Sequence, residues 1–221
     1  MNTAIPLLSA RGLTAKRSWR TILENVSLDI FPGDRIYLTG PNGSGKTTFL
    51  ETLLGLHPHS AGALRWLNRP GSPAAQQAFQ RGEIFYLPQR DNLFASLTLR
   101  QNIFLGTEPN HRSERRLIEA MELLPDLKPS IDRKPAHVSA GQRQIAAVIR
   151  IVVREPILVV LDEPTAGIAI GLVAIVYDIV ARLLPDSTAI VFTDQHAVAA
   201  RANANHHFVL EAGQLRTVII E

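Results

Sequence analysis

The sequence contains no cysteine among its 221 residues, and this absence excludes disulfide bonds and thiolate metal sites. It also lacks a long hydrophobic run, because no segment reaches the roughly 18–20 apolar residues that a membrane-spanning helix needs. The longest candidate, residues 168–184, is interrupted by Asp178 and Arg182. The N-terminal stretch has no apolar segment of the secretory type. We therefore expect a cytoplasmic protein that reaches a membrane only when a partner holds it there.

The sequence also lacks a strong excess of either charge sign, because its formal net charge is only +3. So mild an excess fits contact with an anionic membrane surface or with nucleic acid, but most such charge is simply solvated. The hydrophobic fraction is 46%, and the length suffices for one well-buried α/β unit, at most with a small subdomain.

The most informative stretch is GPNGSGKTT, Gly40 to Thr48, which fits the phosphate-loop pattern G-x-x-x-x-G-K-[ST]. An apolar run over 35–39 predicts a strand before it, and a periodic run over 47–54 predicts a helix after it. Glycines let backbone N–H groups approach a polyphosphate, and the helix start adds free amides. Lys46 adds a positive charge. The context therefore predicts a nucleotide phosphate site instead of a chance glycine-rich turn.

A second strong signal is the apolar strand predicted over 157–161, which ends in Asp162 and Glu163. At a strand end the chain turns, so both acids can reach one site. Asp162 suits Mg²⁺ through a water molecule, and Glu163 suits a general base that orients water toward the γ-phosphate. Two exposed acids at a turn are the plain alternative, but a phosphate loop in the same chain favours the functional interpretation.

Two further motifs are weaker by themselves. Gln89 follows a strand predicted over 84–87, where its amide oxygen suits a metal or a water, although most such glutamines are ordinary loop residues. Ser139 and Gln142 have capping-box spacing at the start of a helix expected to run to about Val153. This motif fits an anion site as well as a capped helix.

The rest of the chain alternates between strand-like and helix-like segments. Trp19 lies between two of the strands, where it either stacks on an adenine or occupies a rim without a ligand role. Residues 69–81 are rich in Pro, Gly and Gln and predict a surface excursion, and residues 92–134 predict a helical insertion with helices over 97–105 and 113–124. The other expected elements are strands over 7–13, 26–30, 64–67, 188–192, 208–210 and 215–220, and helices over 171–184 and 197–204.

Taken in order, GPNGSGKTT, LPQ, VSAGQRQ, LVVLDEPTAG and the terminal LEAG resemble the nucleotide-binding subunit of an ATP-binding cassette (ABC) transporter. The resemblance covers nearly the whole chain. It implies an α/β fold: a RecA-like P-loop NTPase core with an antiparallel β edge subdomain and an inserted α-helical subdomain. It also implies a single ABC ATPase domain over 1–221, with the core at about 1–88 and 139–221 and the helical subdomain at about 89–138.

The same resemblance implies the cofactors ATP and Mg²⁺ and assigns the site residues. Glu163 is the catalytic glutamate, Lys46 acts with it, and the metal is held by Thr47, Gln89 and Asp162. Ser139, Ala140, Gly141 and Gln142 form the signature that contacts ATP bound by the other subunit of a head-to-tail dimer. The expected ATP contacts within the chain are Gly40, Pro41, Asn42, Gly43, Ser44, Gly45, Lys46, Thr47, Thr48 and Trp19, although the family's adenine-stacking aromatic falls a residue or two before Trp19.

Three departures from the family pattern stand out. Ala140 replaces the first glycine of the signature, and an added methyl there costs roughly 1–3 kcal/mol, or about 10- to 100-fold in rate if it acts on the transition state. Ala169 replaces an aspartate of the next loop. The switch histidine corresponds to Gln195 or to His196. Counting back from Gly213 favours Gln195, which can donate to a phosphate but cannot titrate.

These observations predict an ATPase that powers translocation through separate transmembrane permease subunits, placed on the cytoplasmic face of the inner or plasma membrane. It is expected to work as a homodimer, or as a heterodimer with another ABC ATPase subunit. One alternative is a degenerate ABC ATPase that acts as a slow ATP-dependent switch. Another is a soluble ABC protein that acts on nucleic acid, but no nucleic acid is expected because the chain has neither a second cassette nor a long coiled-coil insertion.

Overall fold

The computed structural model describes residues 5–90 and 92–218, and a six-stranded sheet forms its centre. The strand order is β10-β9-β3-β8-β7-β6, in which β9 and β10 form an antiparallel hairpin and the other neighbours run parallel. All carboxyl ends of the parallel strands therefore meet at one edge. The strands are β3 (Arg35–Thr39), β6 (Ile84–Leu87), β7 (Leu158–Asp162), β8 (Ala189–Thr193), β9 (His206–Glu211) and β10 (Gln214–Val218).

A four-stranded antiparallel sheet, ordered β2-β1-β4-β5, covers one side of this centre. Its strands are β1 (Leu8–Arg17), β2 (Arg20–Ile30), β4 (Ala61–Trp66) and β5 (Arg69–Pro70). The strands expected over 7–13 and 26–30 are longer than predicted, because Arg17 pairs directly with Arg20 across a two-residue turn. Such a tight turn lets the ladder of hydrogen bonds continue to its end. The turn itself consists of Ser18 and Trp19.

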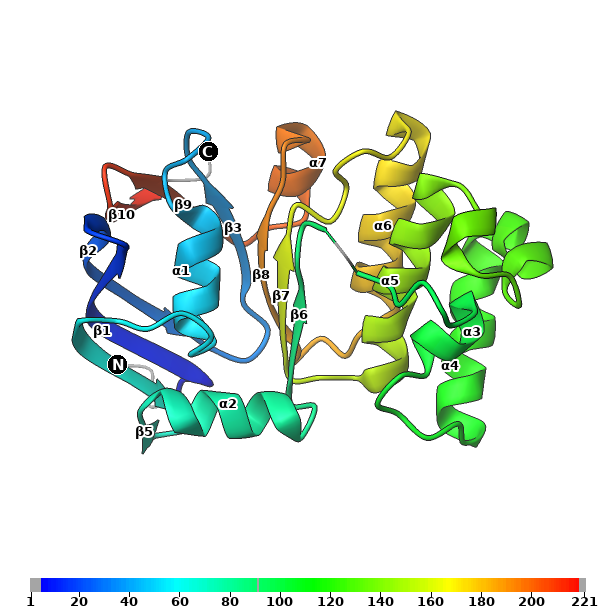
Figure 1. Ribbon diagram of the computed structural model, residues 1–221, viewed down its shortest axis with the longest axis horizontal. Coiled ribbons are helices and arrows are strands. Elements are labelled where there is room, and N and C mark those ends of the chain that lie inside the picture. The colour runs from blue at the N-terminus through cyan, green and yellow to red at the C-terminus, as the bar shows by residue number, and fades with distance from the viewer. Residues whose placement is uncertain (1–4, 91, 219–221) are drawn as a thin grey trace.

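Helices cover both faces of the six-stranded sheet (Figure 1). On one face lie α1 and α2, on the other α5 and α6, with α3 and α4 outermost against α5. No helix in the described part of the chain is long and apolar enough to cross a membrane. The helices are α1 (Lys46–Leu53), α2 (Ser72–Gln80), α3 (Leu99–Ile103), α4 (His111–Leu123), α5 (Ala140–Arg154), α6 (Ile170–Leu183) and α7 (Ala197–Ala202), with 3₁₀ turns over Pro125–Ser130 and Pro135–His137.

The prediction of a surface excursion over 69–81 is wrong, because these residues form β5 and α2. Pro73 stands in the first turn of α2, where a missing N–H costs nothing. Ala74, Ala75 and Ala78 are buried along one face of the helix. Gly71 and Pro73 therefore mark the start of a packed helix, and small residues let it lie close to the sheet.

The remaining elements are confirmed to within a few residues, including the strand before the phosphate loop and the helix after it. Residues 219–220 of the last expected strand lie outside the described residues. The domain boundaries near 88 and 138 stay a prediction. The helical segment shares its core with one face of the sheet, since Leu117 and Leu127 belong to the same hydrophobic cluster as Val159.

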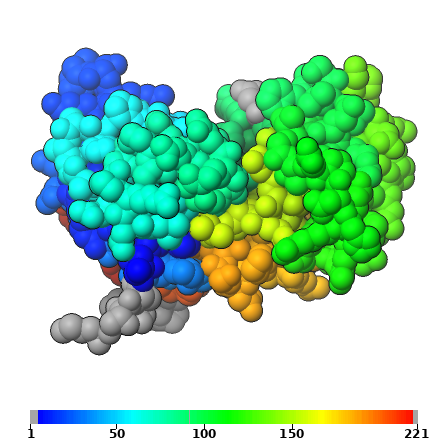
Figure 2. All heavy atoms as spheres, turned by 90° about the horizontal axis from the view of Figure 1, so that it is seen from below, coloured from blue at the N-terminus to red at the C-terminus, as the bar shows by residue number. Residues whose placement is uncertain are grey.

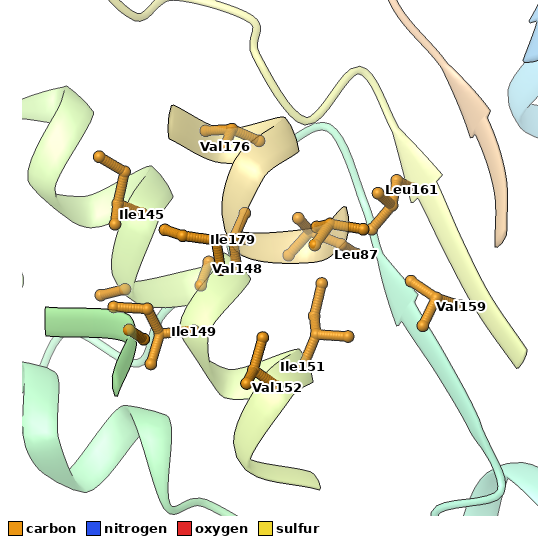
Figure 3. Close-up of a cluster of buried hydrophobic side chains, with 14 of the residues drawn as sticks. Leu87, Ile145, Val148, Ile149, Ile151, Val152, Val159, Leu161, Val176 and Ile179 are labelled. Atoms are coloured by element: carbon orange, nitrogen blue, oxygen red, sulfur yellow. The ribbon is translucent and has the colours of Figure 1, made fainter. Parts of the chain in front are cut away.

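The six-stranded sheet divides the hydrophobic core into two clusters, and the side chains along β7 alternate between them. Val159 and Leu161 point into the cluster formed with α5 and α6, which Figure 3 shows in close-up. Leu158 and Val160 point into the other cluster, which is formed with α1 and α2. Successive side chains of a strand face opposite sides, so β7 supports both clusters at once. This packing holds α1 and α5 on opposite faces.

A buried histidine joins β9 to the strand that precedes the phosphate loop. His207 is 5% exposed, its Nε2 atom lies 2.9 Å from Thr39 Oγ1, and its ring stacks on Tyr37 at 5.0 Å between centroids. Burial lowers the pKa of His207, and the charge of Arg201 adds to the effect. The folded chain therefore disfavours protonation of this imidazole.

This lowered pKa predicts a loss of stability in acid. The unfolded chain binds a proton at His207 near a pKa of about 6.5, whereas the folded chain resists it, so the free energy of unfolding falls as pH drops below that value. Replacing His207 with Phe removes the titrating group and should reduce this fall. Urea unfolding of the wild type and of the His207→Phe variant at about pH 7.5 and about pH 5.5, on either side of that pKa, measures the fall in the free energy of unfolding. An equal loss of stability in the two would contradict the assignment.

Candidate nucleotide site

The candidate site lies where the carboxyl ends of β3, β6, β7 and β8 meet. A cavity of about 360 Å³ opens there. Crevices at this edge of parallel sheets are where ligands bind in α/β folds. The lining residues are Arg17, Ile22, Asn42, Gly43, Gly45, Lys46, Thr47, Thr48, Gln89, Asp162, Glu163 and Gln195.

The phosphate loop connects β3 to α1 and packs tightly against its neighbours. At Gly40 φ is +146°, and a Cβ atom would lie 2.2 Å from the Leu210 carbonyl oxygen. At Gly45 φ is +98°, and a Cβ atom would lie 2.5 Å from Ile22 Cγ2. A side chain at either position would collide or strain the backbone, so the loop path requires glycine at both.

Donors for an anion gather inside this loop. Lys46 Nζ lies over the loop and donates to the carbonyl oxygens of Gly40 at 2.8 Å and Pro41 at 3.1 Å. Ser44 Oγ is buried and has no hydrogen-bond partner among the described residues. No described side chain caps the N-terminus of α1, so the N–H groups of its first turn remain available. This arrangement suits phosphate oxygens.

Asp162 joins the ends of β7 and β8 to the start of α1 by hydrogen bonds. Its buried carboxylate accepts from Thr47 Oγ1 at 2.6 Å through one oxygen and from Thr193 Oγ1 at 2.7 Å through the other. Thr193 is the last residue of β8 and was not among the predicted site residues. Its place beside the end of β7 comes from sheet pairing, which local sequence does not reveal.

The oxygen atoms of Thr47, Asp162 and Gln89 fit the hard-ligand chemistry of Mg²⁺. The described residues contain no cluster of three or more His, Cys, Asp or Glu side chains that would form a complete metal cage. Such a sparse set is usual where Mg²⁺ keeps several waters and shares substrate phosphates.

Glu163 is held in an unusual backbone conformation, with φ at +52°. Its N–H donates to Thr193 Oγ1 at 2.9 Å, and its Oε2 atom accepts from Gln89 Nε2 at 2.6 Å and from Gln195 Nε2 at 2.7 Å. Left-handed backbone in a residue with a side chain persists only where surrounding contacts impose it. The three contacts fix both the backbone and the carboxylate of Glu163.

Gln195 and His196 lie in different surroundings. Gln195 lines the cavity, whereas His196 Nδ1 lies 2.8 Å from Thr165 Oγ1 and also close to Asp194. The buried Asp194 carboxylate accepts hydrogen bonds from Thr165 and from Tyr177, at 2.8 Å for the phenol. Burial raises the pKa of Tyr177, and the neighbouring Asp194 charge adds to it. Gln195 therefore contacts Glu163 at the cavity, whereas His196 belongs to the hydrogen-bond network around Asp194.

The predicted signature begins α5 as a capping box. Ser139 Oγ accepts from the Gln142 N–H, and Gln142 Oε1 accepts from the Ser139 N–H, both at 3.1 Å. At Gly141 a Cβ atom would lie 2.5 Å from Leu172 Cδ1, so α5 and α6 meet closely there. Because α5 and α1 cover opposite faces of the sheet (Figure 1), one chain does not bring residues 139–142 to the cavity of its own phosphate loop.

Trp19 is not brought to the cavity. Its side chain is 89% exposed at the turn between β1 and β2, and the lining includes Arg17 and Ile22 instead. Arg17 stands two residues before Trp19, where the family's aromatic was expected. A guanidinium can stack on an aromatic ring, so an arginine at this position is chemically compatible with a base contact.

Comparison with known proteins gives one family. The model of the family described as ABC transporter matches residues 23–166. The chain is 34% identical over 199 residues to the zinc import ATP-binding protein ZnuC 1 of Hahella chejuensis, covering 88% of this chain and 71% of that protein. It is 27% identical over 195 residues to the high-affinity branched-chain amino acid transport ATP-binding protein BraG of Pseudomonas aeruginosa, covering 87% of this chain and 84% of that protein.

Solved structures agree on the fold. The dimeric post-hydrolysis structure of the ATP-binding cassette MJ0796 bound to ADP and Pi superposes with a TM-score of 0.81 at 21% identity, covering 97% of this chain and 99% of that one. A structure described as the ATP-binding subunit of an ABC transporter superposes with a TM-score of 0.82 at 22% identity, covering 96% of this chain and 90% of that one. The predicted fold is thus confirmed. With a family model over more than half of its length, the chain belongs to the ABC transporter family, as an ATP-binding and ATP-hydrolysing subunit.

Proposed function

We propose that this chain hydrolyses ATP in the cavity at the phosphate loop and that the resulting movement drives transport through separate transmembrane permease subunits. The observation that supports it most is the meeting of Lys46, Asp162 and Glu163 around one cavity. The relatives are named for different cargoes, zinc and branched-chain amino acids among them, so cargo choice is assigned to the permease subunits. The proposed place of work is the cytoplasmic face of the inner or plasma membrane.

The residue roles follow from the contacts. Lys46 and the amides of the phosphate loop would bind the β- and γ-phosphates. Thr47 and Gln89, with Asp162 through a water, would hold Mg²⁺, which supplies positive charge to neutralise the phosphate oxygens. Glu163 would orient the attacking water and take its proton, while Gln195 holds the Glu163 carboxylate at 2.7 Å.

A second copy, or a related ATPase subunit, would complete each cavity. The capped start of α5 at Ser139 offers free amides but lies on the face of the sheet opposite α1. In a head-to-tail dimer the residues 139–142 of one subunit would cover the ATP bound by the other. The Ala140 methyl would then lie where backbone meets phosphate, and a slow ATP-dependent switch is the alternative that this substitution and Ala169 favour.

The permease contact is proposed at a groove of about 370 Å³ between α2, β6 and the end of α5. Figure 2 shows its flanks, with the teal surface of α2 on one side and the green helical segment on the other. Arg150 and Arg154 lie over the ring of Phe85, at 5.5 and 5.7 Å from its centroid, and Phe94 on the rim is 57% exposed. The groove thus combines apolar side chains with two cations that lie side by side.

These cations indicate the chemistry of the occupant. Burial lowers the pKa of both guanidinium groups, and for Arg150 the charge of Arg154 adds to this effect. Within the described residues, Arg150 Nε has no hydrogen-bond partner. A cytoplasmic permease segment that carries a carboxylate would offset both the burial and the repulsion.

Replacing Glu163 with Gln should leave ATP binding intact but reduce turnover by about 100-fold or more, because an amide cannot take a proton. Replacing Lys46 with Ala should remove most ATP binding, and Lys128→Ala serves as the control lysine. Equilibrium binding of ATP and steady-state phosphate release measure the two effects. Wild-type turnover by the Glu163→Gln chain would refute the assignment of the base.

Replacing Gln195 with Ala should reduce kcat by about 10- to 100-fold, because a hydrogen bond to a charged carboxylate is lost at the reacting centre. The neighbouring change His196→Ala should leave kcat within about twofold, because His196 contacts Thr165 and Asp194, and none of the described residues that reach Glu163 depends on it directly. The same phosphate-release assay compares both chains. A larger loss in His196→Ala than in Gln195→Ala would reverse the assignment.

Reversing the charge at Arg154 with Glu should release the chain from the membrane fraction of its cells, while ATPase activity of the isolated chain stays within about threefold, as expected for a change outside the cavity. The control is Arg115→Glu, a reversal at an exposed arginine of α4. Membrane fractionation and ATPase assays measure the two effects. Unchanged membrane association would exclude this groove, and salt-dependent RNA or DNA binding by the wild type would favour the nucleic-acid alternative.

A further inference from the structure

The side chain of Gln144 on α5 connects two segments that are far apart in sequence. Its Nε2 atom donates to the Pro164 carbonyl oxygen at 2.7 Å, and its Oε1 atom accepts from Asn92 Nδ2 at 3.2 Å. Both ends of the amide are used, so one side chain bridges the segment after β6 and the segment after β7. Gln144 is not among the residues that line the nucleotide cavity in the described chain.

The bond to Pro164 acts directly beside Glu163. Glu163 has φ at +52°, and its backbone N–H is held from one side by Thr193. On the other side, the Gln144 amide holds the carbonyl of the following residue, Pro164. Because a left-handed residue with a side chain relaxes unless its surroundings restrain it, these two bonds together maintain the conformation that directs the Glu163 carboxylate into the cavity.

The bond to Asn92 connects this point to the groove assigned above to the permease. Asn92 lines that groove together with Phe94 and Arg150. It also lines a second cavity of about 410 Å³, which Gln144, Gln89 and Gly167 share. Asn92 is therefore the residue through which contact in the groove reaches Gln144. From there a single further hydrogen bond reaches the chain that follows Glu163.

We propose that Gln144 is a positioning residue for ATP hydrolysis, which restrains the backbone after Glu163 and links it to the permease groove through Asn92. This inference rests on the assignment of Glu163 as the base in the proposed function. Gln144 would not touch ATP, so its loss should change the rate of the chemical step and leave the affinity for nucleotide unchanged.

The test replaces Gln144 with Met, which keeps the length of the side chain and removes both hydrogen bonds. We expect kcat to fall about 10-fold with KM for ATP within about twofold, as for the loss of one hydrogen bond that acts on the transition state. The matched control is Gln76→Met, because Gln76 Nε2 also donates to a backbone carbonyl, that of Gly55 at 2.8 Å, on α2 away from the nucleotide cavity. This control should leave kcat unchanged.

A second variant, Gln144→Glu, keeps an acceptor for Asn92 but cannot donate to the Pro164 carbonyl. Its kcat should therefore fall at least as far as that of the Gln144→Met variant.

The double change Asn92→Ala with Gln144→Met should lower kcat little more than Gln144→Met alone, because both residues belong to one chain of hydrogen bonds. Unchanged kcat in both Gln144 variants, or an equal fall in Gln76→Met, would overturn the inference. Glu163→Gln, assayed in parallel, separates the two failures: if only Glu163→Gln is inactive, the base assignment stands and the role of Gln144 falls.

Discussion

The structure of the site depends on the hydrogen bonds of Asp162 at the end of β7. One carboxylate oxygen holds Thr47 at the start of α1, and the other holds Thr193 at the end of β8. Thr193 in turn accepts from the N–H of Glu163. These contacts place the phosphate loop, the candidate metal ligands and the candidate base at fixed distances from each other. A buried carboxylate stays in such a place only when its oxygens are satisfied, and here two hydroxyls satisfy them.

The hydrophobic core determines which of the sequence motifs lie together within one chain. Because β7 supplies alternate side chains to two clusters, α1 and α5 are held on opposite faces. The phosphate loop and the capped start of α5 both offer free amides, yet the same packing that orders them keeps them apart. In the proposed head-to-tail dimer, the α5 start of another subunit would complete the site, and closing and opening of that pair would supply a motion that hydrolysis can drive.

In the proposed function, transmission to a membrane partner would use polar contacts at the border between the sheet and the helical segment. The residues that follow β6 carry Gln89, which holds Glu163 directly, and Asn92, which reaches Pro164 through Gln144. The same segment borders the groove with the paired arginines. A displacement there would therefore change two of the contacts that orient Glu163, which gives a short physical route between partner and catalytic centre.

Much of this could be predicted from the sequence, because it is encoded locally. The phosphate loop, the apolar strand ending in Asp162 and Glu163, and the capping box at Ser139 depend on neighbouring residues, and glycine, helix capping and strand alternation act over a few positions. Counting along the chain already favoured Gln195 over His196, but only the tertiary structure showed that Gln195 donates to Glu163. Only the tertiary structure, too, placed Arg17 and not Trp19 in the cavity lining, and brought Thr193 and Gln144 into hydrogen bonds with Glu163 and Pro164. These contacts join residues brought together by sheet order and helix packing, which depend on how the whole core is buried and not on any local pattern.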